Sequence, residues 1–219
     1  MSKNKVITKA EYKGHPVNAG IVQEFSYSTK ILDKNQELLD STLRRHNKVL
    51  CYRMDLRFPD DKTYENPTKI LSSFMNVYTN GLSRKGYDPA YAARLEQETS
   101  VNPHLHVEML VDGNLAKDYR PLVEDAETRW DRMLGVSSKG GGGDENEGLV
   151  DFCNKKKDGT PQKNGIIVRR NSPHFNKQYD QVHQQMSYLA KDKAEDIIPD
   201  GTRVISYSRY KRGKGRNKD

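Results

Sequence analysis

The chain has 219 residues, a net charge of +7 and a hydrophobic fraction of 34%, which suits one well-buried domain with extra segments. No run approaches the 18 apolar residues of a membrane span, and the basic N-terminus lacks the apolar core of a secretory signal. We therefore expect a polar, intracellular protein. Cys51 and Cys153 are too few and too far apart for a disulfide framework or a structural zinc knot.

Positive charge is concentrated at the C-terminal end. The last twelve residues hold six Lys and Arg side chains, among them Lys211 and Arg212, and one aspartate, for a net charge of +5. A glycine-spaced basic tail of this kind is usually disordered. It can serve solubility alone, or it can add a salt-dependent contact to nucleic-acid phosphates. The sequence at this point leaves both roles open.

The first third of the chain predicts two helices around a strand. Residues 1–30 have weak periodicity and are expected to form an irregular arm. Residues 33–46 carry their apolar side chains on one helical stripe, and residues 48–58 alternate in polarity as a strand does. A second helix is predicted from Pro67 to about residue 83, because proline suits the first helical position.

The middle of the chain predicts a β-hairpin. In residues 91–99, Arg94, Glu96 and Glu98 share one face of a short strand, and a loop over 100–103 leads into a second strand. That second strand runs up to Asp112-Gly113, with Leu105, Val107, Met109 and Val111 on one face and His104, His106 and Glu108 on the other.

The last part of the chain completes an α+β domain with one mainly antiparallel sheet. A helix over 121–134 buries Trp130, and a glycine-rich acidic stretch at 137–148 is expected to be a flexible loop. A helix over 176–192 is predicted to place Tyr188 and Lys191 on its exposed face, and a strand over 202–207 closes the domain.

The two histidines of the hairpin are the first candidates for chemistry. His104 and His106 stand on the same strand face, so they can offer two neutral nitrogens to one divalent ion. A carboxylate on the partner strand, Glu96 or Glu98, would complete a site with open positions. The alternative interpretation is a polar strand face in contact with solvent.

A tyrosine three residues before a lysine adds a second candidate. With a divalent ion polarising a phosphate oxygen, the hydroxyl of Tyr188 could attack phosphorus and form a covalent phosphotyrosine, and Lys191 could steady the developing charge. Together these groups predict cleavage of a phosphodiester. The alternative for Tyr188 is a surface tyrosine that covers the core.

These motifs resemble those of a known superfamily. Two segments are similar to the H-U-H and Y-x-x-K motifs of the HUH endonucleases, which initiate rolling-circle replication. They are Pro103-His104-Leu105-His106 and Tyr188-Leu189-Ala190-Lys191. The order of motifs over residues 48–209 is closer still to the inovirus-type gene-II-like replication proteins, including YagK/YfjJ-type prophage proteins. That order also includes the segments Tyr52-Arg53-Met54-Asp55-Leu56-Arg57 and Arg94-Leu95-Glu96-Gln97-Glu98.

The resemblance implies a palm-like antiparallel sheet flanked by helices in a catalytic domain over 48–209, with an N-terminal arm and helix over 1–47 and a basic tail over 210–219. It implies His104, His106 and Glu96 as ligands of Mg²⁺ or Mn²⁺, Glu98 as the alternate carboxylate and Glu108 as a weaker third. Tyr188 would be the single nucleophile, because position 184 is Gln where some relatives have a second tyrosine.

The expected substrate is single-stranded or hairpin origin DNA. Arg53 and Arg57 would contact its backbone if their strand face is the face of the histidines, and Lys211 and Arg212 would contact it from the tail. No Walker loop is present, so a host or phage helicase and polymerase are the expected partners, in the cytoplasm of a bacterial host. The competing hypotheses are a non-cutting DNA-binding regulator of replication and a transposase or mobilisation nickase with the same chemistry.

Overall fold

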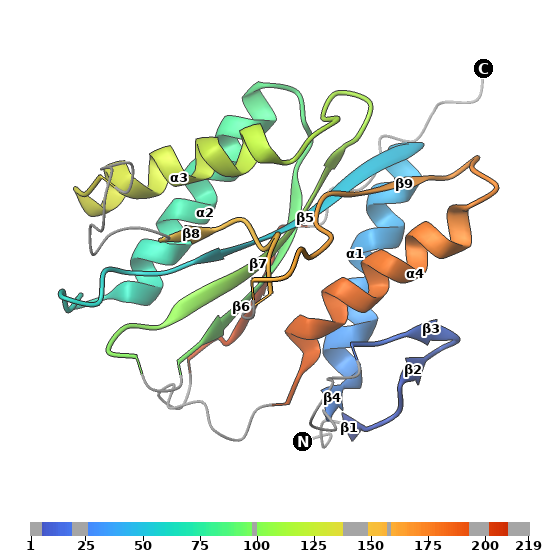
Figure 1. Ribbon diagram of the computed structural model, residues 1–219, viewed down its shortest axis with the longest axis horizontal. Coiled ribbons are helices and arrows are strands. Elements are labelled where there is room, and N and C mark those ends of the chain that lie inside the picture. The colour runs from blue at the N-terminus through green and yellow to red at the C-terminus, as the bar shows by residue number, and fades with distance from the viewer. Residues whose placement is uncertain are drawn as a thin grey trace.

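An antiparallel sheet runs through the middle of the computed structural model, with two helices on each side (Figure 1). The structure describes residues 6–18, 26–97, 100–137, 149–156, 159–192 and 202–209. The elements in chain order are β1 (Val6–Ile7), β2 (Glu11–Tyr12), β3 (His15–Pro16), β4 (Tyr27–Ser28), α1 (Thr29–Arg45), β5 (Lys48–Leu56), α2 (Pro67–Arg84), β6 (Ala90–Glu96), β7 (His104–Asp112), α3 (Arg120–Leu134), β8 (Val150–Asp151), β9 (Ile166–Arg169), α4 (Phe175–Met186), the 3-10 helix η1 (Ser187–Ala190) and β10 (Ile205–Tyr207).

The sheet has the strand order β10-β6-β7-β5-β8, and β9 pairs with the other end of β5. Every pair is antiparallel. On the outer edge of β5, β9 pairs with residues 48–51 and β8 with residues 55–56. The outer edge of this strand is therefore covered by two short strands with a gap between them.

Alternation along β5 and β7 divides the sheet into two faces. One face packs under α2 and α3 in a core that contains Leu50, Tyr52, Met54 and the fully buried Trp130. The other face packs at one end against apolar residues of α1 and α4. The predicted alternation of both strands is confirmed, and so is the burial of Trp130.

The helix ends follow local chemistry. Pro67 occupies the start of α2, where its missing N–H costs nothing. Gly135 ends α3 in the left-handed conformation, with φ of 67°, and its N–H donates to the carbonyl of Asp131. In the part of the chain that the structure describes, no helix is long and apolar enough to cross a membrane.

The expected α+β fold and the hairpin of β6 and β7 are confirmed, while three details of the prediction are wrong. The arm is not irregular throughout, because residues 6–18 and 26–28 contribute four two-residue strands. Strands β8 and β9 were not predicted. The last helix ends at Met186 rather than at residue 192, and η1 follows it. Residues 138–148 and 210–219, expected to be a flexible loop and a basic tail, lie outside the described residues.

Candidate active site

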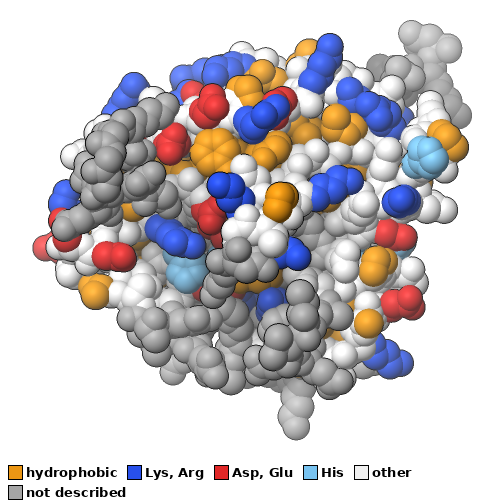
Figure 2. Space-filling model, viewed as in Figure 1, with side chains coloured by type: hydrophobic (Ala, Val, Ile, Leu, Met, Phe, Trp, Pro, Cys, Tyr) orange, Lys and Arg blue, Asp and Glu red, His pale blue; other side chains and the backbone are white. Residues whose placement is uncertain are grey.

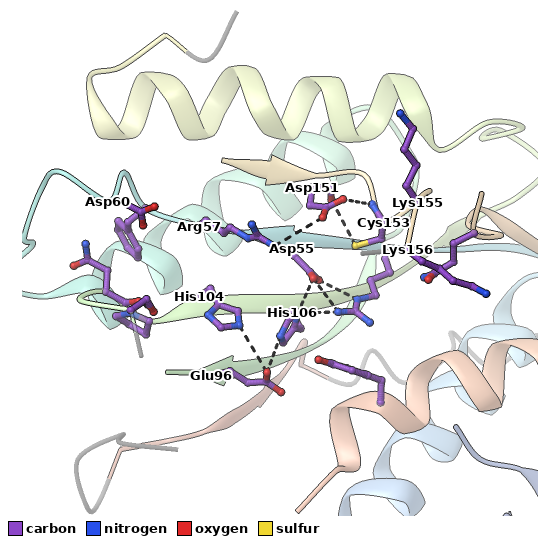
Figure 3. Close-up of a pocket in the computed structure, with 17 residues that line it drawn as sticks. Asp55, Arg57, Asp60, Glu96, His104, His106, Asp151, Cys153, Lys155 and Lys156 are labelled. Atoms are coloured by element: carbon purple, nitrogen blue, oxygen red, sulfur yellow. Dashed lines mark hydrogen bonds and ion pairs between the residues drawn. The ribbon is translucent and has the colours of Figure 1, made fainter. Parts of the chain in front are cut away.

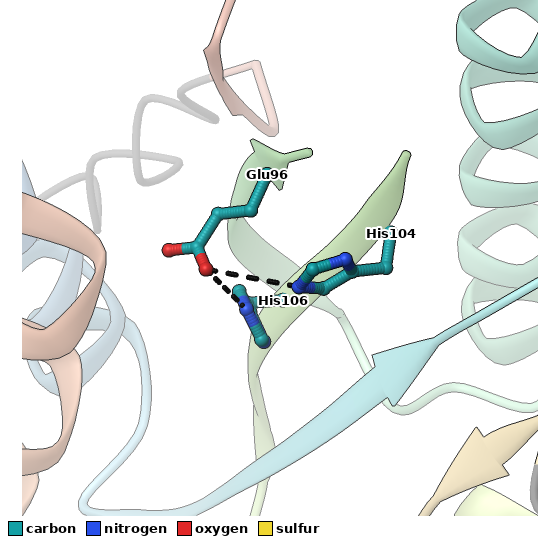
Figure 4. A group of neighbouring side chains, drawn as sticks. All are labelled: Glu96, His104 and His106. Atoms are coloured by element: carbon teal, nitrogen blue, oxygen red, sulfur yellow. Dashed lines mark hydrogen bonds and ion pairs between the residues drawn. The ribbon is translucent and has the colours of Figure 1, made fainter. Parts of the chain in front are cut away.

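Two histidines and one glutamate meet at the end of the β6–β7 hairpin. The register places Glu96 directly opposite His104, and His106 follows on the same face of β7. Glu96 Oε2 lies 2.9 Å from His106 Nε2 and 3.7 Å from His104 Nε2 (Figure 4). One ligand atom from each residue falls within 4.8 Å of the others. Three convergent donors at this spacing fit a divalent metal ion.

The donor set limits the kind of ion without selecting one. Two imidazole nitrogens and one carboxylate oxygen suit several divalent metals, since imidazole favours Zn²⁺, Cu²⁺ or Ni²⁺ and carboxylate favours Mg²⁺ or Mn²⁺. Glu96 and His106 are almost completely buried, whereas the His104 side chain is 26% exposed. The site therefore opens toward solvent on the His104 side, where a substrate oxygen could reach a bound ion.

Buried charges surround His106. Its Nδ1 lies 2.8 Å from Asp55 Oδ2, on the neighbouring strand β5. Burial by itself lowers the pKa of His106, but the charge and hydrogen bond of Asp55 and the hydrogen bond of Glu96 outweigh it and raise the pKa above its usual value. A metal ion bound at Nε2 would compete with a proton for that nitrogen.

Tyr188 lies beside this cluster. Its ring stands edge-on to the ring of His106, with the two centroids 5.1 Å apart. Two cations lie over the same tyrosine ring: Arg53 Cζ is 4.1 Å from its centroid, and Lys191 Nζ is also 4.1 Å away. Both cations therefore make cation–π contacts with the Tyr188 ring.

The backbone around Tyr188 differs from the expectation. Tyr188 lies in η1 instead of the α-helix, and Lys191, expected on an exposed face, is only 7% exposed. The 3-10 turn, with three residues per turn, takes Tyr188 off the α-helical track. Lys191 follows the turn with a ψ of 133°, and its Nζ lies over the Tyr188 ring.

An open pocket of about 500 Å³ is lined by Glu96, His104 and His106 together with Arg53, Asp55 and Tyr188 (Figure 3). Cationic side chains from two further segments reach it: Arg57 at the end of β5, and Lys155 and Lys156 between β8 and β9. Acidic Asp60 and Asp151 also line the pocket. The described Lys and Arg side chains on this side of the molecule are scattered rather than gathered in one patch (Figure 2), so surface charge alone does not single out the pocket.

The two arginines expected to contact DNA differ in environment. Arg53 and Asp55 do share the face of the histidines, but the Arg53 side chain is 13% exposed and is paired with Asp55. Arg57 is 58% exposed, and its closest acidic oxygen, in Asp151, is 4.0 Å away. Glu98, Lys211 and Arg212 lie outside the described residues, so their predicted roles are not located here.

Three groups at the site were not given these roles by the sequence. Asp55 contacts His106. The strand alternation in the sequence places Asp55 and Arg53 on one face of β5, but only the register of β5 and β7 brings them to His106. Lys155 and Lys156 reach the pocket through a loop that no periodicity marks. Glu108, the weaker ligand candidate, instead accepts a hydrogen bond of 2.8 Å from Gln185 Nε2. Burial raises the pKa of Glu108 to about 7.

The family profile described as "YagK/YfjJ C-terminal domain" matches residues 21–203, most of the chain. The chain belongs to this family. Its matched region contains every described residue of the candidate site. No curated protein and no solved structure matches the chain.

Proposed function

We propose that this YagK/YfjJ-family protein is an HUH-type endonuclease: a metal-dependent nickase and strand transferase that acts on single-stranded DNA. The observation that carries the proposal is the position of Tyr188, whose ring lies 5.1 Å from that of His106 in the pocket that also contains Glu96 and His104. A tyrosine placed this close to three potential ligands has a chemical use that a surface tyrosine lacks.

Each residue of the site has a separate role in one phosphoryl transfer. A divalent ion held by Glu96, His104 and His106, expected to be Mg²⁺ or Mn²⁺, would supply a Lewis acid for one phosphate oxygen. The Tyr188 oxygen attacks phosphorus as the bond to the 3′ oxygen breaks. The 3′ oxygen takes a proton and leaves as a hydroxyl, while the 5′ phosphate stays on the tyrosine. Lys191, over the ring, favours the anionic tyrosine.

The free 3′ hydroxyl defines the biological role in this proposal. It can prime DNA synthesis, and its return to the phosphotyrosine rejoins the strand, as rolling-circle replication of a phage, satellite or plasmid-like element requires. A host or phage helicase and polymerase would supply unwinding and synthesis in the bacterial cytoplasm. The exposed Arg57, Lys155 and Lys156 at the pocket support binding of a phosphate backbone.

Covalent capture tests the proposal directly. Purified protein is incubated with single-stranded DNA from its own element, with manganese or with chelator, and the products are separated on a denaturing gel. We expect a metal-dependent protein–DNA adduct that is absent in Tyr188→Phe. The control Tyr179→Phe, which removes a phenol hydroxyl from α4 outside the pocket, should still form it.

Two results would contradict the proposal. A Tyr188→Phe variant that nicks at the full rate would exclude this tyrosine as the nucleophile. Absence of an adduct with any strand of the element, despite tight and salt-sensitive binding, would indicate a non-cutting DNA-binding regulator.

A further inference from the structure

We infer that Arg53 and Asp55 are positioning residues that hold the tyrosine and the metal ligand His106 in one fixed arrangement, rather than contacts for DNA. The inference rests on the proposed function. Arg53 and Asp55 lie two residues apart on β5, opposite Glu108 and His106 of β7. They are in contact with the two groups whose relative position the reaction depends on.

Asp55 fixes the orientation of His106. Both Asp55 and Arg53 approach His106 Nδ1, with Asp55 Oδ2 at 2.8 Å and Arg53 Nη2 at 2.9 Å. An arginine nitrogen can only donate, so the partner for an Nδ1 proton is the carboxylate of Asp55. A proton kept on Nδ1 leaves the Nε2 lone pair available on the side of Glu96, where a metal ion would bind.

Arg53 extends the same arrangement to the tyrosine. Its Nε donates to Asp55 Oδ1 at 2.9 Å and its Nη2 to Asp55 Oδ2 at 2.8 Å, which is the two-pronged geometry that a guanidinium forms with a carboxylate. The carbon at the centre of this guanidinium lies 4.1 Å from the ring centroid of Tyr188. One planar group therefore contacts the tyrosine while it is fixed to the carboxylate that orients His106.

The backbone of Arg53 is fixed as well. The side chain of Asn164 occupies the gap between β8 and β9 on the edge of β5. Its Oδ1 accepts from the Arg53 N–H at 2.9 Å, and its Nδ2 donates to the Arg53 carbonyl at 2.8 Å. An amide side chain thus replaces the missing strand at this one residue and holds the backbone from which the Arg53 side chain reaches Asp55.

Arg57 shows what a DNA contact on the same strand face would look like. It is four residues farther along and 58% exposed, against 13% for Arg53. An exposed guanidinium can meet a phosphate without first losing a buried partner. Breaking the Arg53–Asp55 pair would instead separate two largely buried opposite charges, which is costly.

The test compares Arg53→Lys with Arg57→Gln. For Arg53→Lys, which keeps the charge and loses the planar fork, we expect at least a tenfold slower single-turnover nicking rate at saturating DNA and a DNA dissociation constant within twofold of wild type. Manganese affinity should also fall several-fold. For Arg57→Gln we expect weaker DNA binding with a smaller salt dependence and an unchanged manganese affinity.

Asp55→Asn gives a readout that does not depend on cleavage. The amide has the same size as the carboxylate but no charge. Loss of the carboxylate charge should lower manganese affinity by about 10- to 100-fold, measured by calorimetry with manganese chloride alone. Asn164→Ala disturbs Arg53 without removing a charge and should slow nicking with unchanged DNA affinity. Unfolding transitions in chelator establish that each variant is folded.

The outcomes separate this inference from the proposed function. If wild type fails to nick but Asp55→Asn and Arg53→Lys still lose manganese affinity, the nickase proposal fails and the positioning of the metal ligand stands. If wild type nicks and Arg53→Lys nicks at the same rate while binding DNA more weakly, Arg53 is a DNA contact and the inference is overturned. Wild-type manganese affinity in Asp55→Asn would overturn it too.

Discussion

The two faces of the central sheet are built from the same strands and differ in almost every respect. Beneath α2 and α3, Trp130 meets Phe58 and Phe74 edge to face, each with ring centroids 5.2 Å apart. On the opposite face lie the buried Asp55 and His106 and the largely buried Arg53. A closely packed aromatic core lies one residue along the strand from a cluster of buried charges.

This contrast separates the face that supplies stability from the face that carries the candidate site. Burying apolar area stabilises the fold in proportion to the area removed from water. Burying charges costs desolvation free energy that their attraction barely offsets, so a buried ionic cluster is weak evidence for stability. The gathering of these charges at one end of one sheet face is better explained by a functional site. Four predictions test how far this division holds.

The largest expected effect belongs to the apolar face. Trp130 is fully buried, and its indole N–H donates to the Arg57 carbonyl at 2.7 Å. Trp130→Ala should lower the free energy of unfolding by about 3–5 kcal/mol, because it removes a large buried ring and leaves a cavity. Urea titration measures this, and manganese affinity of the folded fraction should not change. A parallel loss of manganese affinity would show that the two faces are coupled.

The charged face should respond to pH through Glu108, whose pKa is raised to about 7 by burial. A carboxyl with a raised folded-state pKa favours the folded state below its unfolded value near 4.5, and this contribution is lost as the pH rises through about 7. The size of this contribution is on the order of 3 kcal/mol, because each pKa unit corresponds to about 1.4 kcal/mol. Glu108→Gln, an uncharged isostere, should therefore flatten the unfolding free energy between about pH 5 and pH 8.

Urea titration of wild type and Glu108→Gln at both ends of this range checks the prediction. The variant should be the more stable protein at the alkaline end. Asp55 provides an internal control, because Arg53 and His106 hold its pKa well below the usual range despite burial, so its stabilisation is lost only in acid. If the unfolding free energy changed equally with pH in both proteins, ionisation of Glu108 would carry no cost in folding free energy, and the prediction would be wrong.

Metal binding should stabilise the protein through the same face. At a manganese concentration 100 times the dissociation constant, ligand linkage raises the unfolding free energy by about 2.7 kcal/mol. Thermal unfolding with manganese or chelator measures the effect. His104→Ala should abolish most of it, whereas His174→Ala, at an exposed position before α4, should retain it. Equal shifts in both variants would argue against a site at His104.

The smallest effect is expected at the edge of the pocket. Lys156 is exposed and lines the pocket, so Lys156→Ala should remove one phosphate contact and lower the salt slope of single-stranded DNA binding by about 0.7. Fluorescence anisotropy over a range of salt concentrations measures the slope. Lys69→Ala, an exposed lysine on α2 outside the pocket, is the matched control. Identical slopes for both would place the DNA elsewhere.

Much of this division was predictable from alternation in the sequence. The strand periods of β5 and β7 fixed which side chains share a face, and the short connection from β6 to β7 predicted the hairpin that brings Glu96 to His104. These features depend on local spacing, which is why they could be foreseen. Arg53 and Asp55 could be assigned to a face of β5 but not to a partner strand, because register depends on contacts distant in sequence.

The 3-10 turn at Tyr188 and the strands β8 and β9 illustrate the other limit. Two- to four-residue strands carry too little periodicity to identify. The apolar spacing of a helix also continues past Met186, so no local signal indicates the 3-10 turn at residues 187–190 or the burial of Lys191 after it. The spacing to Lys191 singled out Tyr188 as a candidate, but the surroundings of its ring required the tertiary structure.

The broken edge of β5 has a consequence for how this site can diversify. The segment between β8 and β9 leaves the sheet beside the pocket and returns to the same strand, and the contacts of Asn164 secure the point of return. Insertions or deletions within such a segment cost little, because loop-closure entropy grows slowly with length. The wall of the pocket can therefore change length and sequence, and with them the ligands that fit it, while the strands that carry Glu96, His104 and His106 stay in register.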